Sequence, residues 1–359
     1  MGLGWLENVS TPALVIDYNK LVKNIETMAN FAKENKVNLR PHIKTHKCPK
    51  IGQMQLEAGA CGICVATIGE AEVFTEKGFN DILIANEVVE INKMIRLIEI
   101  NKKNLVRVCV DSKKNINDLS KLANKVNVKL EVLIDIDVGL GRTGVKPGKS
   151  VLKLAKFIKE LPNLELVGFM GYEGHLTYLT DFGYKKQQTE LCMKMLVDTR
   201  DLLNENGFEI EYITTSGSGT YMIAGKYPGI TEIQPGTYPF FDEHMSKCVP
   251  NFEIALTILA TINNQTGKRN FTLDMGSKAC STADGKPIFK EYPKSKMTLL
   301  TEEHGQFRAG KDDSFEIGQK VELIPGHVCP TVNLYDFFNV IKDDKLIDKW
   351  EISARGKNY

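Results

Sequence analysis

Three cationic side chains and two imidazoles fall within eight consecutive residues of this chain, Arg40-Pro41-His42-Ile43-Lys44-Thr45-His46-Lys47. If the segment ends a β-strand, Arg40, His42 and Lys44 alternate onto one face. A lysine that points inward among other cations and apolar neighbours loses its proton more readily, as imine formation with an aldehyde requires. A charged surface run would have the same composition, and Lys47 competes with Lys44 for the role. These residues by themselves leave both questions open.

Small residues gather in a second segment directly after a predicted strand, Thr215-Ser216-Gly217-Ser218-Gly219-Thr220. Backbone N–H groups without bulky side chains can surround an anion, and barrels often hold phosphate at this position. The amide of Gly236 and the phenol of Tyr238, in the turn that follows, could donate to the same anion. An ordinary flexible turn is the alternative interpretation.

Two further segments place polar side chains at predicted strand ends. Arg142 lies between glycines in DVGLGRTG, where it could donate to a cofactor oxygen or cap backbone carbonyls at a barrel rim. Tyr172 and His175 follow another strand, in GYEGH. The imidazole of His175 could face a planar ligand, so we count this pair among the cofactor-binding candidates. A histidine packed in the core is the alternative.

An imidazole and a thiol stand two residues apart in His327-Val328-Cys329. On a strand this spacing puts both side chains on one face, within reach of one ion. Thiolate and imidazole together favour zinc over magnesium or calcium. Two ligands are too few for a closed structural site, so water or substrate would complete a catalytic centre. A buried cysteine beside a chance histidine is the alternative.

These candidates follow a repeated pattern of β-branched runs and helical stretches between residues 12 and 240, which is typical of βα units. Eight such units favour an α/β fold with a closed (β/α)8, TIM-like barrel, whose functional groups project from the carboxyl ends of the strands. The helix that begins at Thr67-Ile68-Gly69-Glu70 has a predicted capping box. The predicted strands cover residues 13–17, 38–44, 62–67, 81–87, 105–112, 129–139, 164–174 and 210–220.

After about residue 245 the pattern changes to short alternating strands broken by Gly, Asn, Asp and Pro, as in QKVELIPGHVCPTVNLYDFFNVI. The chain therefore divides into two predicted domains. The barrel occupies residues 1–245, and a β-strand domain carrying His327 and Cys329 occupies residues 246–359. No low-complexity linker or internal repeat separates them.

Composition narrows the choice of partner. The 359 residues have a net charge of +1, which gives no field to attract nucleic acid or an anionic membrane. We find neither a leader peptide nor a membrane span, and expect a cytoplasmic protein with a small-molecule partner. The eight scattered cysteines should be reduced thiols. Cys61 and Cys64 form C-x-x-C, but their apolar context favours a buried strand over a redox or metal pair.

Taken together, the motifs resemble the fold type III pyridoxal phosphate enzymes, specifically the D-serine dehydratase and D-threonine aldolase family of the alanine racemase-like group. The resemblance covers nearly the whole chain and rests most on RPHIKTHK and PGHVCPTVN. It implies pyridoxal 5'-phosphate joined to Lys44 as a Schiff base, which decides against Lys47, and it places Arg142 near the 3'-oxygen of the cofactor. The phosphate contacts that it implies come from Ser216, Gly217, Ser218, Gly219, Thr220, Gly236 and Tyr238.

The same resemblance implies that His327 and Cys329 bind a divalent metal beside the cofactor. Zinc is favoured and manganese is the alternative, because the His-x-Cys form looks more like zinc-dependent D-serine dehydratases than like aldolases that favour manganese. The family is similar to alanine racemase in forming homodimers, in which the β-domain of one subunit closes the barrel of the other. The active sites would then be shared.

The implied activity is that of a lyase on a small D-3-hydroxy amino acid. The favoured reaction is D-serine dehydration to pyruvate and ammonia. The alternative is a D-threonine or D-3-hydroxyaspartate aldolase, which gives glycine and an aldehyde. An amino-acid racemase is a third possibility, and a chelator would distinguish it, because racemisation has no leaving group for a metal to polarise.

Overall fold

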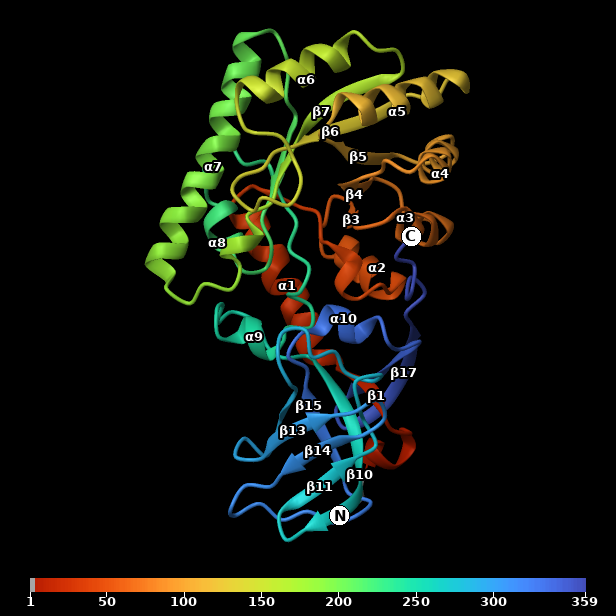
Figure 1. Ribbon diagram of the computed structural model, residues 1–359, viewed down its shortest axis with the longest axis vertical. Helices are drawn as coiled ribbons and strands as arrows, with labels where there is room; N and C mark the ends of the chain where they lie inside the picture. The colour runs from red at the N-terminus through yellow and green to blue at the C-terminus, as the bar shows by residue number, and fades with distance from the viewer. Residues whose placement is uncertain (1–3) are drawn as a thin grey trace. The chain divides into compact units, whose positions relative to one another are not determined.

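The computed structural model describes residues 4–359 and contains two compact units, each with its own β-sheet (Figure 1). The barrel unit comprises residues 28–44, 51–236 and 357–359. The sheet unit comprises residues 4–27, 45–50 and 237–356. Because the chain passes between the units several times, neither unit is one continuous stretch of sequence.

Eight parallel strands form the curled sheet of the barrel unit, in the order β2-β9-β8-β7-β6-β5-β4-β3. An isolated parallel bridge between His42 and Cys64 brings the segment after β2 beside β3, at the other end of this order. The predicted TIM-like fold is confirmed. The strands are β2 (Asn38–Leu39), β3 (Ile63–Val65), β4 (Ile82–Glu87), β5 (Val106–Val110), β6 (Leu130–Asp135), β7 (Leu164–Gly171), β8 (Tyr212–Thr215) and β9 (Glu232–Ile233).

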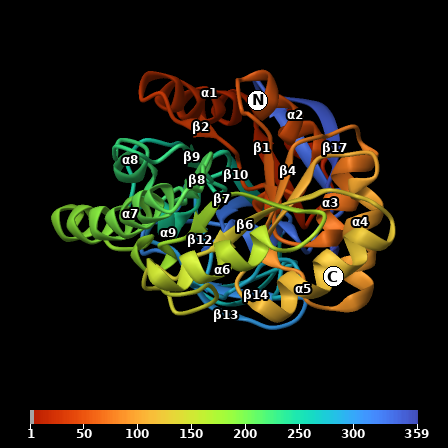
Figure 2. The ribbon, with the colours of Figure 1, turned by 90° about the horizontal axis from the view of Figure 1, so that it is seen from above.

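Helices follow most of these strands, and Figure 2 shows α3 to α7 along the outside of the ring. In α6, Val151, Leu154 and Ile158 recur at helical spacing and are buried, as expected where one helix face covers a sheet. Thr67 accepts a hydrogen bond from Glu70 N at 3.2 Å, which confirms the predicted start of α3. The helices are α1 (Tyr18–Glu34), α2 (Pro49–Glu57), α3 (Ile68–Glu76), α4 (Ile91–Asn101), α5 (Lys113–Lys125), α6 (Lys149–Lys159), α7 (Phe182–Glu205) and α8 (Tyr221–Ala224).

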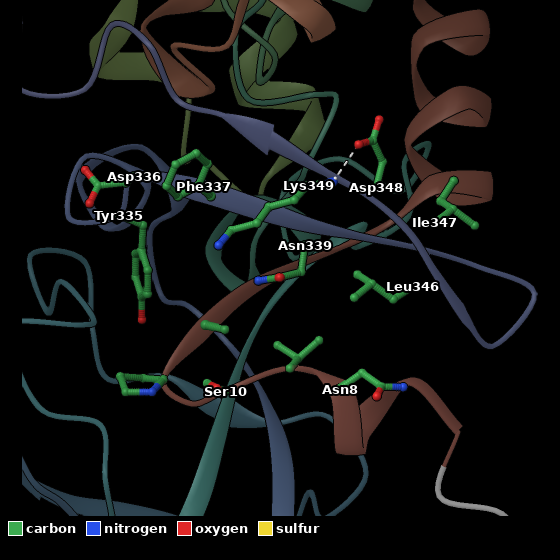
Figure 3. Close-up of a pocket in the computed structure, with 13 residues that line it drawn as sticks. Asn8, Ser10, Tyr335, Asp336, Phe337, Asn339, Leu346, Ile347, Asp348 and Lys349 are labelled. Atoms are coloured by element: carbon green, nitrogen blue, oxygen red, sulfur yellow. Dashed lines mark hydrogen bonds between the residues drawn. The ribbon is translucent and has the colours of Figure 1, made fainter.

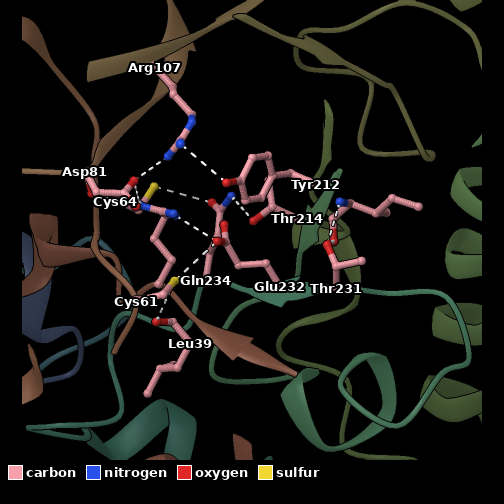
Figure 4. Close-up of polar contacts among 12 residues, drawn as sticks. Leu39, Cys61, Cys64, Asp81, Arg107, Tyr212, Thr214, Thr231, Glu232 and Gln234 are labelled. Atoms are coloured by element: carbon pink, nitrogen blue, oxygen red, sulfur yellow. Dashed lines mark hydrogen bonds and ion pairs between the residues drawn. The ribbon is translucent and has the colours of Figure 1, made fainter. Parts of the chain in front are cut away.

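A polar network joins strands of the barrel sheet (Figure 4). Arg40 is only 2% exposed, and its guanidinium contacts Glu232 at 2.9 Å and Asp81 at 2.8 Å. Arg107 pairs with Asp81 and, at 2.7 Å, with Glu131. These side chains come from five different strands or their immediate flanks. The network therefore links parts of the barrel that are far apart in the sequence.

Two predicted strands differ from the structure. Residues 13–17 form β1 (Ala13–Asp17), which lies in the sheet unit between β10 and β16 rather than in the barrel. The remaining barrel strand is β9, next to β2 and β8. In segment 38–44 the strand ends at Leu39, and Lys44 lies in the 3-10 turn η2 (Ile43–Thr45). The alternation predicted for Arg40, His42 and Lys44 is therefore wrong, because a local apolar pattern does not fix where a strand ends or which sheet it joins.

The sheet unit is β-rich, as predicted. Its strands run in the order β13-β14-β11-β10-β1-β16-β17, with β15 pairing to β10 and β12 to β15. Val15, Leu259 and Ile341, from three neighbouring strands, pack in one buried cluster. The elements are η1 (Gly4–Asn8), β1, α9 (Glu243–Ser246), β10 (Leu256–Gly267), β11 (Asn270–Leu273), β12 (Ile288–Phe289), β13 (Lys296–Leu300), β14 (Gly305–Arg308), β15 (Lys320–Ile324), α10 (Val328–Val332), β16 (Phe337–Lys342) and β17 (Lys345–Glu351).

All eight cysteines are free thiols. Cys64 is fully buried in β3, as predicted, whereas Cys61 precedes the strand. No helix within residues 4–359 combines the length and the apolar character needed to cross a lipid bilayer.

Candidate active site

The predicted site residues of the barrel unit lie beyond the carboxyl ends of its parallel strands, where barrels carry chemistry. They are Lys44 after β2, Arg142 after β6, Tyr172 and His175 after β7, Ser216–Thr220 after β8 and Gly236 after β9. The other three belong to the sheet unit and are Tyr238, His327 and Cys329.

Lys44 is half-buried, and its backbone N–H donates to His42 Nδ1 at 3.5 Å. Its charge acts on the thiol of Cys64, which is buried inside the barrel. Burial raises the pKa of that thiol, and the positive charges of Arg40 and Lys44 oppose the shift. The amine of Lys44 therefore lies within electrostatic reach of the barrel interior. Lys47, in contrast, belongs to the sheet unit.

The segment Ser216–Thr220 forms a tight turn in which close neighbours exclude larger side chains. A Cβ on Gly219 would lie 2.4 Å from the carbonyl oxygen of Thr177, so only glycine fits. Ser216 has a φ of 69°, in the left-handed region. Its Oγ is buried and has no hydrogen-bond partner within residues 4–359. An orphaned hydroxyl in a glycine-containing turn after a barrel strand fits the phosphate of pyridoxal phosphate.

A buried carboxyl supports this turn from the end of β7. Glu173 Oε2 accepts hydrogen bonds from Thr215 Oγ1 at 2.9 Å and from Ser216 N at 3.3 Å. Oε1 is buried and has no such partner in the described part of the chain. Burial raises the pKa of Glu173, against the effect of the hydrogen bond from Thr220. Sequence analysis assigned no role to Glu173, although it stands inside the GYEGH motif.

Three of the predicted residues come together at the ends of β6 and β7. The guanidinium carbon of Arg142 lies 5.5 Å from the centroid of the Tyr172 ring, a cation–π contact. Asp137 fixes the loop that carries Arg142, because its Oδ1 accepts from Gly139 N at 2.9 Å. The ring of His175 packs against the same loop, since a Cβ on Gly139 would meet it at 3.3 Å.

A pair of carboxyls that sequence analysis did not single out stands at the ends of β4 and β6. Glu87 and Asp135 interact, and Asp135 Oδ2 also accepts from Thr143 Oγ1 at 2.7 Å. Burial, followed by the negative charges of Asp135 and Asp111, raises the pKa of Glu87 to about 8. Glu87 ends β4 and Asp135 ends β6 in the structure, and nothing in the sequence shows that these two carboxyls interact across the strand between them.

His327 and Cys329 lie at the start of the short helix α10, not on a strand as predicted, so the alternation argument for this pair is wrong. The two side chains nevertheless interact. His327 Nδ1 lies 3.3 Å from Asp242 Oδ2 and 3.4 Å from Asp284 Oδ2. Burial acts to lower the pKa of His327, but hydrogen bonds to Asp242 and Cys329 raise it to about 10. Cys329 Sγ is also 3.2 Å from Thr45 Oγ1.

This donor set fits a divalent cation held by two protein ligands. Asp242 is fully buried, and its Oδ2 accepts from Val328 N at 3.2 Å and lies within ion-pair distance of His327 Nδ1, which has no hydrogen-bond partner among the described residues. With this carboxyl beside Nδ1, Nε2 of the imidazole and the neighbouring thiol could serve as ligands. Across residues 4–359 no group of three His, Cys, Asp or Glu side chains is placed to hold a metal. Water or substrate would therefore complete the coordination sphere.

A surface pocket of about 570 Å³ in the sheet unit contains none of the predicted site residues. Figure 3 shows it between Asn8 and Ser10 on one side and strand residues such as Asn339 and Lys349 on the other. Its lining lacks histidine and cysteine, so it offers no imidazole or thiolate ligand for a metal.

Two family models match successive parts of the chain. The alanine racemase N-terminal domain matches residues 16–244, and the putative serine dehydratase domain matches residues 255–341. The chain is also 33% identical to a D-threonine aldolase of an Arthrobacter species, over 98% of this chain and 94% of that protein. It is 31% identical to a 3-hydroxy-D-aspartate aldolase of Paracoccus denitrificans, over 98% of this chain and 93% of that protein.

Solved structures of two relatives also match this chain over nearly its whole length. A D-threonine aldolase from Filomicrobium marinum matches with a TM-score of 0.95 and 32% identity, over 98% of this chain and 97% of that one. A D-threo-3-hydroxyaspartate dehydratase, in a metal-free cysteine-to-alanine variant, matches with a TM-score of 0.88 and 25% identity, over 96% and 98% of the two chains. The similarity thus extends across both units.

Proposed function

Because this chain belongs to the D-serine dehydratase and D-threonine aldolase family of fold type III pyridoxal phosphate enzymes, we propose that it is an aldolase, which cleaves the Cα–Cβ bond of a D-3-hydroxy amino acid. The products would be glycine and an aldehyde. The candidate substrates are D-threonine and D-3-hydroxyaspartate.

The full-length match to two aldolases, at 33% and 31% identity, is the observation that carries this proposal. Sequence analysis favoured D-serine dehydration, and the comparisons support its aldolase alternative better. The preference for dehydration rested on the His-x-Cys form of one ligand pair. The two aldolases match nearly the entire chain, so the comparison with them takes many more residues into account than one ligand pair does.

Lys44 is the proposed attachment point of pyridoxal phosphate, and Ser216–Thr220 the proposed holder of its phosphate. When bound, the cofactor supplies an electron sink for negative charge on the substrate α-carbon. Ser216 Oγ would donate to the phosphate, which would satisfy a hydroxyl that is otherwise buried without a partner in the described residues. Gly236 and Tyr238 are proposed as further donors.

Arg142, Tyr172 and His175 are proposed to orient the ring and the substrate. The contact between Arg142 and the Tyr172 ring holds the guanidinium in place, ready to donate to a cofactor oxygen. Cleavage of the Cα–Cβ bond requires removal of the β-hydroxyl proton. The imidazole of His175 is the proposed acceptor of that proton.

His327 and Cys329 are the proposed ligands of a divalent metal ion. Bound there, the ion supplies a Lewis acid for the substrate hydroxyl. The buried carboxyl of Asp242 lies beside Nδ1, so Nε2 is the nitrogen that would bind the metal. A thiol combined with an imidazole favours zinc, and manganese is the alternative.

The decisive assay incubates the holoprotein with D-threonine, D-3-hydroxyaspartate and D-serine, with and without EDTA, and identifies the products. We expect glycine and an aldehyde from at least one of the first two substrates, and loss of this activity with EDTA. If no glycine forms from either, the aldolase proposal is wrong.

Dehydration remains a second candidate because of Cys329. A relative with a solved structure, a D-threo-3-hydroxyaspartate dehydratase, is a cysteine-to-alanine variant in the metal-free form. This chain carries a cysteine beside His327. The same assay separates the candidates, since dehydration of D-serine or D-3-hydroxyaspartate gives a keto acid and ammonia and no glycine.

A further inference from the structure

We propose that Lys185 is a positioning residue. It would act without touching the reacting atoms, by holding the turn Ser216–Thr220, and would give the protein its preference for a phosphorylated ligand. This inference rests on the proposed function, because it concerns the turn assigned to the cofactor phosphate. It assigns a role to a side chain on α7, which lies outside the strand ends that form the site.

Lys185 is buried and lies directly behind the turn. Only 1% of the residue is exposed. Its Nζ donates to the carbonyl oxygen of Gly219 at 3.4 Å and to that of Thr177 at 3.2 Å. Gly219 belongs to the turn, and Thr177 is the residue against which Gly219 packs so closely that a Cβ would not fit. One ammonium group therefore fixes both sides of this close contact.

The orientation of these bonds favours anion binding. An ammonium that draws the carbonyl of Gly219 toward itself keeps this negative end of the peptide dipole on the α7 side of the turn. Three backbone N–H groups of the turn are already hydrogen-bonded, Ser216 N to Glu173 Oε2, Gly217 N to Thr220 Oγ1 and Thr220 N to the Gly217 carbonyl. The donors that the turn would offer an anion are the amide of Gly219 and the hydroxyl of Ser216, which has no partner within residues 4–359. A buried positive charge also lowers the energy of a dianion nearby, and it does so more strongly than an exposed one because water screens it less.

Burial of Lys185 is costly without such a function. Lysine is almost never fully buried, because removing an ammonium from water is unfavourable unless its hydrogen bonds are replaced. The next residue shows the ordinary alternative on the same helix. Lys186 is exposed and forms a surface ion pair with Glu190 at 3.0 Å, four residues further along the helix.

Glu173 holds the other end of the turn and is compatible with a phosphate close by. It accepts the N–H of Ser216 and the hydroxyl of Thr215, so the turn is fixed at Ser216 by a carboxyl and at Gly219 by an ammonium. Burial favours the neutral form of Glu173 by raising its pKa. A neutral carboxyl would not repel a neighbouring phosphate.

The test compares pyridoxal phosphate with pyridoxal, which has the same aldehyde and ring but no phosphate. Each is titrated into the apoprotein, and the dissociation constant is taken from the absorbance of the lysine-bound chromophore. The variants are Lys185→Met, which removes charge and donors, and Lys185→Gln, which is smaller and keeps a donor. Lys186→Met is the matched control on the same helix.

We expect Lys185→Met to raise the dissociation constant for pyridoxal phosphate by about tenfold or more, and that for pyridoxal by less than about threefold. Lys185→Gln also removes the positive charge, so it should lose the preference for pyridoxal phosphate over pyridoxal in the same way. The test can therefore be made even if the methionine variant does not fold. Lys186→Met should match the wild type with both ligands.

Equal weakening of both ligands, or no change in their ratio, would overturn the role of Lys185, because a general defect in folding does not distinguish a phosphate. Failure of the proposed function would look different. In that case the wild-type protein itself would form no lysine-bound chromophore with pyridoxal phosphate, or one that Lys44→Ala leaves unchanged.

Discussion

At the scale of single residues, the proposed chemistry depends on Lys44 rather than Lys47. Lys44→Ala should abolish the visible absorbance of the lysine-bound cofactor, because no other amine would take its place at the end of β2. Lys47→Gln should retain that absorbance, since Lys47 belongs to the sheet unit. Absorption spectra of both variants after addition of pyridoxal phosphate check this. Absorbance that survives in Lys44→Ala would move the attachment point.

Cys329 gives a second test at this scale. Cys329→Ala should lose bound metal and turnover but keep the cofactor absorbance, because it removes one of two proposed ligands and leaves the barrel unit unchanged. Metal content by elemental analysis and the spectrum of the purified protein provide the measurement. Cys248→Ala, at another cysteine of the sheet unit, should keep both the metal and the activity. Wild-type metal content in Cys329→Ala would remove the thiol from the metal site.

Glu87 should make stability depend on pH. Its carboxyl has a pKa of about 8 in the fold against 4.5 ordinarily, so the folded protein holds a proton that the unfolded chain releases. The resulting stabilisation is complete below pH 4.5 and is lost as the pH rises through about 8. Glu87→Gln keeps a neutral side chain at every pH. It should therefore lose less stability than wild type between about pH 5 and pH 9, by about 1–2 kcal/mol after allowance for solvent screening.

Urea denaturation at several pH values measures the effect of Glu87. Parallel curves of the free energy of unfolding against pH for the wild type and Glu87→Gln would contradict this prediction. The pKa of the partner carboxyl, Asp135, is also raised, and burial is again the largest cause. The variant thus tests the pair and not only one group.

At the scale of elements, the barrel depends on ion pairs between strands that are distant in sequence. Arg40 bonds to Asp81 before β4 and to Glu232 in β9. Arg40→Met should lower the free energy of unfolding by about 3–5 kcal/mol, because it leaves the buried Glu232 carboxylate without its cation. Arg355→Met, which breaks an exposed pair with Asp336, should cost less than about 1 kcal/mol. Denaturant titration of both variants checks this, and equal losses would refute the role of the network.

At the scale of the whole molecule, the proposed homodimer can be tested for the origin of its metal ligands. Thr45 follows Lys44 directly in the sequence, and its hydroxyl lies 3.2 Å from Cys329 Sγ of the same chain. If one chain supplies both Lys44 and Cys329 to a site, coexpressed Lys44→Ala and Cys329→Ala chains stay inactive. If the partner chain supplies the metal ligands, random mixing would restore about a quarter of wild-type activity.

Much of the candidate site was predictable because its signals are local. Glycines beside small hydroxyl residues mark a turn, and the period of each preceding segment marks a strand, so Ser216–Thr220 could be placed at a strand end from the sequence. Parallel strands bring their carboxyl ends to one edge of the sheet, which is why Lys44 and Arg142 could be assigned to that edge. The prediction was wrong where it assumed that a strand continues beyond its paired residues. The strand β2 ends at Leu39, before Lys44, and His327 begins a helix instead of lying on a strand.

The sequence by itself determined which reactive side chains the protein carries and that segments such as Ser216–Thr220 follow a strand, because side-chain type and short-range periodicity are properties of neighbouring residues. Only the tertiary structure decided which sheet β1 joins, that Asp242 faces His327, and that Lys185 is buried while Lys186 is exposed. Those outcomes depend on contacts between residues far apart in the chain. In a polar run such as KKQQ, no local pattern tells which of the two lysines the fold will bury.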